Sequence, residues 1–519
     1  MAFTYVVSGS DWAHIAPELT LLVLALLVMV VDAVIPARMR GALVALGVLG
    51  VVSAVVSVIM LYQTSDNTTA FGGMVASDGL ALFAMLVILT ATGLSLLFTP
   101  GYIERQGTHQ QGEYYALVLL AATGMLVMVA ATNLMTIFLG LELLSLPLYV
   151  LCAFAPGQQR AQEAGMKYFL LSSFASGFLL YGMALTYGAT GATNLSDIHH
   201  FVATHGLNAA SGFGPLLLGG MALLAVGLAF KVSAIPFHAW TPDVYQGAPT
   251  SVTALMSVGT KTAAFVALIR IFVVALGPVL NDWQIIMGAL AIVSMLGGNI
   301  LAATQTNVKR MLAYSSIAHA GYLLIGITLG TALGTSALLF YLAAYAMMNL
   351  GAFGVVLVLE RVAGLGTDLA DYRGLSARRP GLAAAMAVFL FALAGIPGTA
   401  GFVAKYTMFY AAVVDGHAEL TIIGVISSMI AFYYYLRVIW AMYFEAVPSN
   451  ASADIASVDV MQVTLTGAPS VVATKVAVQT TPIAVGAVVA LMLALLGTFA
   501  LGIIPSPLID LARQAAGLP

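Results

Sequence analysis

The sequence predicts an all-α polytopic membrane protein with about 14 transmembrane helices, arranged as two inverted repeats of five helices. Three observations predict this fold class: the composition, the number of long apolar segments, and two apolar segments that contain a central proline. Of the 519 residues, 61% are hydrophobic and 8% are charged, whereas a soluble chain carries about 25% charged residues. So few charges cannot solvate the surface of a protein of this size, and lipid must therefore cover most of it.

Composition also excludes several classes of function. The net charge of −3 offers no basic face, so we expect no nucleic-acid partner. The single cysteine, Cys152, lies in an apolar run and excludes a disulfide framework or a zinc or iron–sulfur cluster built by this chain alone. No nucleotide-binding fingerprint or enzyme nucleophile is found, so we expect no cofactor and no metal in this chain. The N-terminus has no positive region, so we expect no cleaved signal peptide.

The count of spans rests on segment length. A spanning helix needs about 20 predominantly apolar residues. The candidate segments run roughly over 16–36, 41–62, 78–99, 114–131, 133–155, 164–189, 214–246, 248–276, 283–304, 309–329, 333–361, 380–414, 418–444 and 482–504.

Positive charges test this count, because Lys and Arg favour cytoplasmic loops. If the N-terminus lies outside, the odd-numbered loops face the cytoplasm. These loops and their borders hold Arg38, Arg40, Arg105, Arg160, Lys309, Arg310, Arg361, Arg373, Arg378 and Arg379. The even-numbered loops, including the long stretch 190–213, hold none. Both termini are therefore predicted on the periplasmic side of a bacterial inner membrane.

Two segments are too long for simple spans, and each contains a proline. Pro236 lies in segment seven, 214–246, and Pro397 lies in segment twelve, 380–414. Proline removes a donor and clashes with the preceding turn, so both helices should break. Broken helices at membrane depth line a cavity or are buried in protein. The breaks lie five helices apart, and a five-helix repeat must invert its topology, so we predict inverted repeats over helices 4–8 and 9–13.

This division gives five parts of the chain. They are N-terminal helices 1–3 over 1–113, the first repeat over 114–276, the second repeat over 283–444, a polar cytoplasmic loop with potential short strands over 445–481, and helix 14 with the C-terminus over 482–519.

Charged residues inside the apolar segments are the candidate functional groups. The deep lysines are Lys231, Lys261 and Lys405, the deep acid is Glu142, and Lys167 lies one turn into helix six. A charge at the bilayer centre costs about 2.5–3.5 kcal/mol on insertion scales, so these groups must face protein or water. Burial destabilises the charged form of a lysine or glutamate, and a nearby opposite charge stabilises it. Lysine can therefore exchange its proton inside the membrane, which arginine effectively cannot do.

Simpler explanations exist for each of these groups. A buried Lys–Glu pair can serve only to fix helix packing, although three deep lysines exceed the one deep acid. Lys167 could extend to the cytoplasmic headgroups. His238 and His319 could relay protons, or they could only hydrogen-bond neighbouring helices.

Several long motifs resemble one known family. They are LGLELLSLPLYVL, EAGMKYFLLSSFASGFLLYG, FKVSAIPFHAWTPDVYQGAPT, VKRMLAYSSIAHAGY and GIPGTAGFVAKY, and they are similar to the N subunit family of NADH–quinone oxidoreductase, respiratory complex I. The resemblance covers roughly residues 75 to 445 in order. It implies fourteen helices with inverted five-helix repeats and two broken helices. The 445–481 loop is longer than the family leads us to expect.

The resemblance also implies roles for individual residues. Glu142 and Lys231 match a modulating pair, Lys261 matches a central relay, and Lys405 matches the terminal proton carrier. Lys167 matches an auxiliary group near the pair. A glutamate at position 405 would indicate the M-type relative, and the L-type relative has a further lateral helix, so the resemblance favours the N-type.

The predicted function is proton translocation driven by quinone reduction elsewhere in a complex. The resemblance implies M-, K- and J-type membrane neighbours and peripheral subunits that hold FMN, iron–sulfur clusters, quinone and NAD(H) or ferredoxin. Three alternatives stay open: a subunit of a multi-subunit cation/proton antiporter, a subunit of a ferredoxin-dependent relative, and a purely structural membrane subunit.

Overall fold

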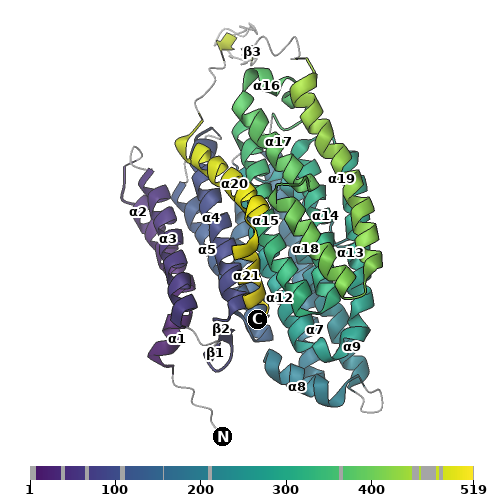
Figure 1. Cartoon of the computed structure of the whole chain (residues 1–519). Coiled ribbons are helices and arrows are strands. Elements are labelled where there is room, and N and C mark those ends of the chain that lie inside the picture. Colours follow the sequence, from purple (N-terminus) through teal and green to yellow (C-terminus); the bar gives the residue numbers. More distant parts are fainter. Residues whose placement is uncertain are drawn as a thin grey trace, which may run out of the picture.

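The computed structural model describes residues 7–36, 41–64, 69–105, 111–155, 157–207, 213–361, 366–446, 455–457, 475–477 and 483–517. The described chain is a bundle of long helices (Figure 1). Its N-terminal half contains α1 (Gly9–His14), α2 (Ala16–Asp32), α3 (Gly41–Thr64), α4 (Gly79–Arg105), α5 (Gln111–Ala130), α6 (Leu134–Cys152), α7 (Gln159–Thr190), α8 (Leu195–His205), α9 (Gly214–Val232), α10 (Trp240–Gly247), α11 (Thr250–Leu255) and α12 (Lys261–Leu268).

The C-terminal half continues in the same way. It contains α13 (Leu280–Ala303), α14 (Val308–Leu329), α15 (Ala332–Leu359), α16 (Leu375–Arg378), α17 (Pro380–Ala394), α18 (Ala400–Val414), α19 (Ala418–Phe444), α20 (Val485–Ile503) and α21 (Ser506–Ala515). Single π-helical segments, η3 (Met256–Thr260) and η4 (Ile269–Ala275), follow α11 and α12, and short 3₁₀ turns are η5 (Gly277–Val279) and η7 (Leu369–Tyr372).

The predicted number of membrane crossings agrees with the structure. Among the described residues, 12 helical spans are long and apolar enough to cross a membrane, and α17 and α18 are shorter apolar helices. The chain is therefore a multi-pass membrane protein. If the α17–α18 pair is counted as one broken crossing and the 17-residue apolar α2 as another, the number agrees with the prediction of about fourteen.

Glycines bring the first two helices of each predicted repeat into close contact. A Cβ on Gly124 of α5 would lie 2.3 Å from the backbone nitrogen of Leu144 on α6. A Cβ on Gly298 of α13 would likewise lie 2.6 Å from the backbone nitrogen of Ala318 on α14. Small residues let helix backbones approach in a membrane, where van der Waals contact drives association. The same packing device thus recurs in both halves.

A second recurring feature is a clasp at the N-terminus of α6 and of α14. Asn133, the N-cap of α6, donates to the Asn194 side chain at 2.6 Å, next to an isolated bridge between the two residues. Asn307, the N-cap of α14, donates to the Asp368 side chain at 2.9 Å beside an equivalent bridge. The first clasp lies beside α8 and the second beside α16, at opposite ends of the bundle (Figure 1). Matching clasps at opposite ends support the inverted repeats.

Both predicted helix breaks are present, and the first begins earlier than its proline. Helix α9 ends at Val232, and its C-cap Ser233 has a left-handed φ of 66°. The chain becomes helical again at Trp240, four residues after Pro236. The second break runs from Gly395 to Thr399 around Pro397, with φ values of 95° at Gly395 and 85° at Gly398. Both prolines are exposed within these connecting segments.

Several elements were not predicted from the sequence. Helix α8 lies in the stretch read as the long loop 190–213, and α21 follows the last span and packs against α4 and α15. Both are amphipathic and too short to span. Strands β1 (Thr69–Ala70) and β2 (Val75–Ala76) form a small hairpin before α4. By contrast, short strands were expected in the 445–481 loop, and there β3 (Ile455–Ser457) pairs antiparallel with β4 (Lys475–Ala477), while most of that loop lies outside the described residues.

The second break predicts a sharp steric effect. A Cβ at Gly401 would lie 1.8 Å from the carbonyl oxygen of Ala392, across the break. We expect Gly401→Ala to lower the stability by about 1–3 kcal/mol or more, as overpacking does. Gly381→Ala in α17 is the matched control, because a Cβ there meets no atom within 4 Å. Thermal inactivation of the detergent-solubilised protein would measure both, and equal melting temperatures would contradict the packing shown here.

Candidate functional site

The three deep lysines lie inside the protein. Lys231 is 2% exposed, Lys261 is 1% exposed and Lys405 is 6% exposed. None of the three forms an ion pair within 4.0 Å among the described residues. Each ammonium instead contacts hydroxyls, backbone carbonyls and aromatic rings. These neutral partners satisfy the hydrogen bonds of the ammonium without fixing its charge as a carboxylate would.

Lys231 lies in the last turn of α9, immediately before the first break. Its Nζ donates to Ser145 Oγ at 2.7 Å and to the Tyr168 hydroxyl at 3.2 Å. The ammonium also lies 5.4 Å from the centre of the Tyr168 ring, within range of a cation–π contact. Helices α6, α7 and α9 therefore meet at this lysine.

Glu142 lies one turn before Ser145 on α6 and is half-buried. Its Oε1 is buried and has no hydrogen-bond partner in the described structure. The carboxylate acts electrostatically on Lys231 but does not touch it. Ser145, whose hydroxyl also donates to the carbonyl of Leu141, instead contacts the ammonium. The predicted Glu142–Lys231 pair is thus not an ion pair within 4.0 Å in the described structure, where the lysine binds Ser145 and Tyr168 instead.

Trp240, the first residue of α10, holds the broken end of α9 in place. Its Nε1 donates to the carbonyl oxygen of Phe230 at 3.0 Å. The indole also stacks on Tyr168 at 4.9 Å and on Phe230 at 5.5 Å between ring centres. The same carbonyl oxygen also accepts from the backbone nitrogen of Ser233 at 3.1 Å, so the indole is its second donor. Trp240, which follows the break, therefore positions Phe230 and Tyr168, two of the residues around Lys231.

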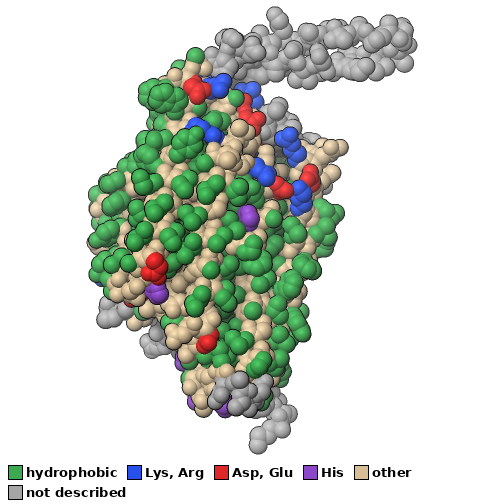
Figure 2. Space-filling view, turned by 90° about the vertical axis from the view of Figure 1, so that its right-hand side faces the viewer, with side chains coloured by type: hydrophobic (Ala, Val, Ile, Leu, Met, Phe, Trp, Pro, Cys, Tyr) green, Lys and Arg blue, Asp and Glu red, His purple; other side chains and the backbone are tan. Residues whose placement is uncertain are grey.

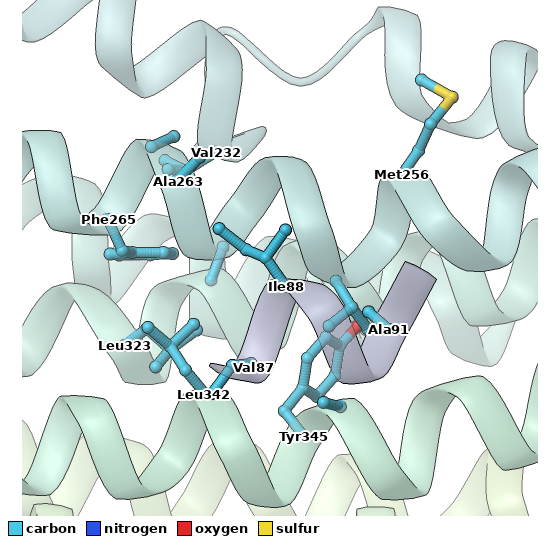
Figure 3. Close-up of a cluster of buried hydrophobic side chains, with 14 of the residues drawn as sticks. Val87, Ile88, Ala91, Val232, Met256, Ala263, Phe265, Leu323, Leu342 and Tyr345 are labelled. Atoms are coloured by element: carbon cyan, nitrogen blue, oxygen red, sulfur yellow. The ribbon is translucent and has the colours of Figure 1, made fainter. Parts of the chain in front are cut away.

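Lys261 follows the π-helical turn η3 and points toward α14. Its Nζ donates to Ser316 Oγ at 2.5 Å and to the Ser316 carbonyl oxygen. The Tyr345 ring of α15 lies 5.9 Å from the ammonium. The side chains that surround this polar contact are mostly apolar. Figure 3 shows Tyr345 within a cluster of buried side chains from several helices, among them Ile88, Phe265 and Leu323.

His319 neighbours the aromatic rings that contact Lys261 and Lys405: its ring centre lies 5.0 Å from that of Tyr345 and 5.7 Å from that of Tyr322. It is 2% exposed, and two tyrosines contact its ring nitrogens. Nδ1 lies 2.8 Å from the Tyr341 hydroxyl, and Nε2 lies 3.4 Å from the Tyr435 hydroxyl. The Tyr435 hydroxyl also bonds the Ser315 hydroxyl. These imidazole and hydroxyl groups carry exchangeable protons, and they extend from the surroundings of Lys261 toward those of Lys405.

Lys405 lies on α18, just past the second break. Its Nζ donates to the carbonyl oxygen of Ala394 at 3.0 Å and lies 5.0 Å from the centre of the Tyr322 ring. Ala394 ends α17, so this carbonyl is one that the break leaves without an intrahelical partner. The lysine also borders an open cavity of about 530 Å³ between α18 and α19, where Ser428 and Thr421 are polar.

Lys167 lies in a different environment. Its side chain is 40% exposed, and Nζ pairs with Glu163 at 2.7 Å and with Asp243 at 2.8 Å. Arg310 of α14 pairs with the other oxygen of Asp243 at 2.7 Å. These groups line a polar hollow of about 230 Å³. Lys167 is thus part of a charge network at the ends of α7, α10 and α14, and Tyr168 beside it touches Lys231.

The remaining predicted residues lie near the breaks. His238 is half-buried in the connection between α9 and α10, two residues after Pro236. The backbone nitrogen of Ile235 in the same connection donates to Ser294 Oγ of α13 at 2.9 Å. This contact ties the first break to the second repeat. Pro397 is exposed next to Thr399, whose hydroxyl donates to the Ile396 carbonyl at 2.7 Å.

Two ion pairs that contain a buried cation were missed from the sequence. Lys309 pairs with Glu360 at 3.3 Å, and their side chains are 2% and 3% exposed. Arg270 is 4% exposed and donates twice to Asp78, at 2.8 and 2.9 Å. Arg270 lies within the apolar segment 248–276, so the criterion that found the lysines would also have found it. Lys309 was read as a loop charge and Glu360 was not singled out, because both flank spans and only the packing of the helices buries them.

No group of three or more His, Cys, Asp or Glu side chains in the described residues is arranged to hold a metal ion. Cys152 is buried, and its Sγ lies 3.4 Å from the Met256 sulfur. What the site contains is a row of exchangeable protons on lysine, serine, tyrosine and histidine. Fold and site together define the class of antiporter-type membrane proteins with two broken helices and a row of buried lysines.

Comparison with known proteins agrees with this class. The family model described as "NADH:quinone oxidoreductase/Mrp antiporter, TM" matches residues 131–431. An NADH-quinone oxidoreductase subunit N of Trichlorobacter lovleyi is 43% identical over 504 residues, covering 97% of this chain and 96% of that relative. A subunit N 1 of Herpetosiphon aurantiacus is 44% identical, covering 87% and 92% of the two chains. The chain therefore belongs to the subunit N family of NADH-quinone oxidoreductase.

Solved structures show the same fold. A chain of respiratory complex I from Thermus thermophilus, with bound aureothin, aligns with a TM-score of 0.74 at 31% identity and covers 96% of this chain and 99% of that one. A chain of the Mrp complex from a Dietzia strain aligns with a TM-score of 0.81 at 22% identity, covering 98% and 97%. The second likeness concerns the fold alone.

The frame around Lys231 yields a stability prediction. Replacing the buried Trp240 with alanine removes two ring stacks and the donor to the Phe230 carbonyl, and truncating a large buried aromatic costs about 3–5 kcal/mol. We expect Trp240→Ala to be strongly destabilising in thermal inactivation. Trp440→Ala is the control, because Trp440 is 59% exposed on α19. An equal effect of both substitutions would mean that Trp240 does not hold the break.

Proposed function

We propose that this chain is the N-type subunit of a proton-translocating NADH–quinone oxidoreductase and carries protons along its row of buried lysines. One observation carries the proposal. Lys231, Lys261 and Lys405 are nearly fully buried, yet each is bound by neutral groups rather than by a carboxylate within ion-pair distance. Burial without a fixed counter-charge favours the neutral amine, so each lysine can release and regain a proton.

The order of the groups suggests a path. A change of charge near Glu142 would alter how strongly Lys231 holds its proton, because the carboxylate acts on that lysine through space. Lys261 would then pass a proton through Ser316 and the His319–tyrosine cluster to Lys405. Lys405 would release it toward the outer side and be reloaded. Lys167 would act as an auxiliary charge beside Tyr168, and His238 as a supporting group at the first break.

The redox chemistry belongs to other subunits in this proposal. NAD(H) or ferredoxin, FMN, iron–sulfur clusters and quinone would be bound by partners, and this chain would be one subunit of a translocase. M-, K- and J-type membrane subunits are the expected neighbours. Relatives that match nearly the whole chain carry the subunit N name, which favours this function over a multi-subunit cation/proton antiporter.

The proposed location is a bacterial inner membrane, with both termini on the periplasmic side. In Figure 2, Lys and Arg side chains gather near one end of the visible face, and apolar side chains cover the middle. Arg373, Arg378 and Arg379 lie at that end, beside α16. The positive-inside rule places it in the cytoplasm.

Substitution of Lys405 tests the proton transfer. We expect Lys405→Ala to lose most of this subunit's proton pumping without loss of assembly, measured as acidification in vesicles that contain the intact complex. Lys405→Arg keeps the charge but effectively cannot give up its proton, so it should also lose pumping. Full pumping in the arginine variant would show that residue 405 does not release a proton.

Purification in mild detergent tests the assignment to a complex. We expect flavin and iron–sulfur subunits to co-purify with this chain, together with NADH-dependent or ferredoxin-dependent quinone reduction. The preferred donor would separate the NADH-linked complex from a ferredoxin-dependent relative. Recovery of other antiporter-like membrane subunits alone, with no redox activity, would favour a cation/proton antiporter.

A further inference from the structure

The Lys309–Glu360 pair has no part in the lysine path described above, yet it is the most deeply buried ion pair in the described chain. Lys309 is the second residue of α14, and Glu360 directly follows the last residue of α15. Glu360 accepts a hydrogen bond from the hydroxyl of Thr250, the first residue of α11. Lys309 also donates to the carbonyl oxygen of Ala248 at 2.9 Å. The pair thus lies where α10, α11, α14 and α15 meet.

A water-accessible hollow lies next to this pair. The hollow is the one lined by Lys167, Asp243, Gly247 and Arg310, among others. Gly247 precedes Ala248, whose carbonyl binds Lys309, and Arg310 follows Lys309 in the chain. About one residue of backbone therefore lies between the ion pair and the charged hollow, both at the end of α10 and at the start of α14. In the proposed orientation, the hollow opens to the cytoplasm.

On its inner side, the pair stands at one end of a polar seam between α11 and α15. Helix α15 runs antiparallel to α11–α12, so Thr250 meets Glu360, Ser257 meets Asn349, and Lys261 meets Tyr345. Successive contacts are about two turns and then one turn apart along α11–α12, and about three turns and then one turn apart along α15. The seam thus leads from the buried pair to the ammonium of Lys261.

Asn349, in the middle of the seam, has an unused acceptor. The residue is 0% exposed, and its amide nitrogen donates to Ser257 Oγ at 2.6 Å. Its Oδ1 is buried and has no hydrogen-bond partner in the described structure. Buried polar atoms are rarely left unpaired, and a water molecule commonly satisfies them. An asparagine at this position suits a chain of water molecules between Glu360 and Lys261.

We propose that the α11–α15 seam is the proton inlet of Lys261, and that Glu360, paired with Lys309, is its proton-loading group. This inference rests on the proposed function. The carboxylate of Glu360 accepts an excess proton from the cytoplasm, delivered by hydronium in the hollow, which is left as neutral water; protonation breaks the ion pair of Glu360 with Lys309. The proton then moves along water molecules held by Asn349 and Ser257 to the neutral amine of Lys261. An O–H bond of the carboxyl breaks, an N–H bond of the lysine forms, and Glu360 returns to the carboxylate that binds Lys309.

The role of Glu360 is tested by two substitutions that separate shape from proton loading. Glu360→Gln keeps the shape and an acceptor for Thr250 but cannot carry the proton, whereas Glu360→Asp is shorter but can. In vesicles that contain the whole complex, the pumping rate per assembled complex should fall in Glu360→Gln to the level of Lys261→Ala. Glu360→Asp should keep most of it. A glutamine variant that pumps as well as or better than the aspartate variant would overturn the role of Glu360, because a purely structural pair needs shape more than a proton.

The role of the seam is tested at Asn349. Asn349→Leu fills the site with an apolar side chain, whereas Asn349→Ser leaves room and polarity for water. Both remove the amide that binds Ser257. Pumping should be lost in the leucine variant and largely kept in the serine variant, and combining Asn349→Leu with Glu360→Gln should cause no further loss. Equal pumping by the two Asn349 variants would overturn the inlet, even where a Glu360 variant fails to assemble.

Two comparisons complete the design. Asp78→Asn alters the other missed ion pair, with Arg270, away from the seam, and should pump at the wild-type rate once assembled. Lys261→Ala distinguishes failure of the proposed function from failure of the proposed inlet. If Lys261→Ala pumps normally, the proposed function itself fails. If Lys261→Ala loses pumping while Glu360→Gln and Asn349→Leu do not, only the inlet is wrong.

Discussion

The desolvation of a lysine ammonium is the constraint on which the rest of this structure depends. A charge at the bilayer centre costs about 2.5–3.5 kcal/mol on insertion scales, so every deep lysine requires acceptors from the protein. Helix breaks supply some of them. Lys405 binds the carbonyl of Ala394 at the end of α17, and Lys309 binds the carbonyl of Ala248 at the end of α10. The irregular backbone is therefore a source of hydrogen-bond acceptors for cations that are buried in the protein.

The partners divide the buried cations into two groups. Lys231, Lys261 and Lys405 are held by hydroxyls, carbonyls and rings, which tolerate either protonation state of the amine. Arg270 and Lys309 are held by carboxylates, which favour the charged form. The first group is suited to moving protons. Arg270 is suited to holding α4 against η4. Glu360, the carboxylate that binds Lys309, differs from the partner of Arg270 because it lies at one end of the polar seam between α11 and α15.

The two halves of the bundle repeat the same construction and then hold each other. Glycine contacts join α5 to α6 and α13 to α14, and asparagine clasps begin α6 and α14. Across the halves, Arg310 binds Asp243 on α10, and Ser294 binds the backbone at the first break. The broken helix of the first half is thus positioned by side chains of the second.

The sequence by itself determined the membrane class, the fourteen crossings, the two breaks and the identity of the deep lysines. These follow from local physics, because segment length, proline and an isolated charge in an apolar run each have a consequence that needs no distant partner. Tertiary structure decided the rest. Lys231 binds Ser145 rather than Glu142, Lys167 faces a hollow, and Lys309 is buried with Glu360 although both flank spans. Each of these depends on which helix ends pack together, and residues that meet there are 51 to 110 positions apart in the chain.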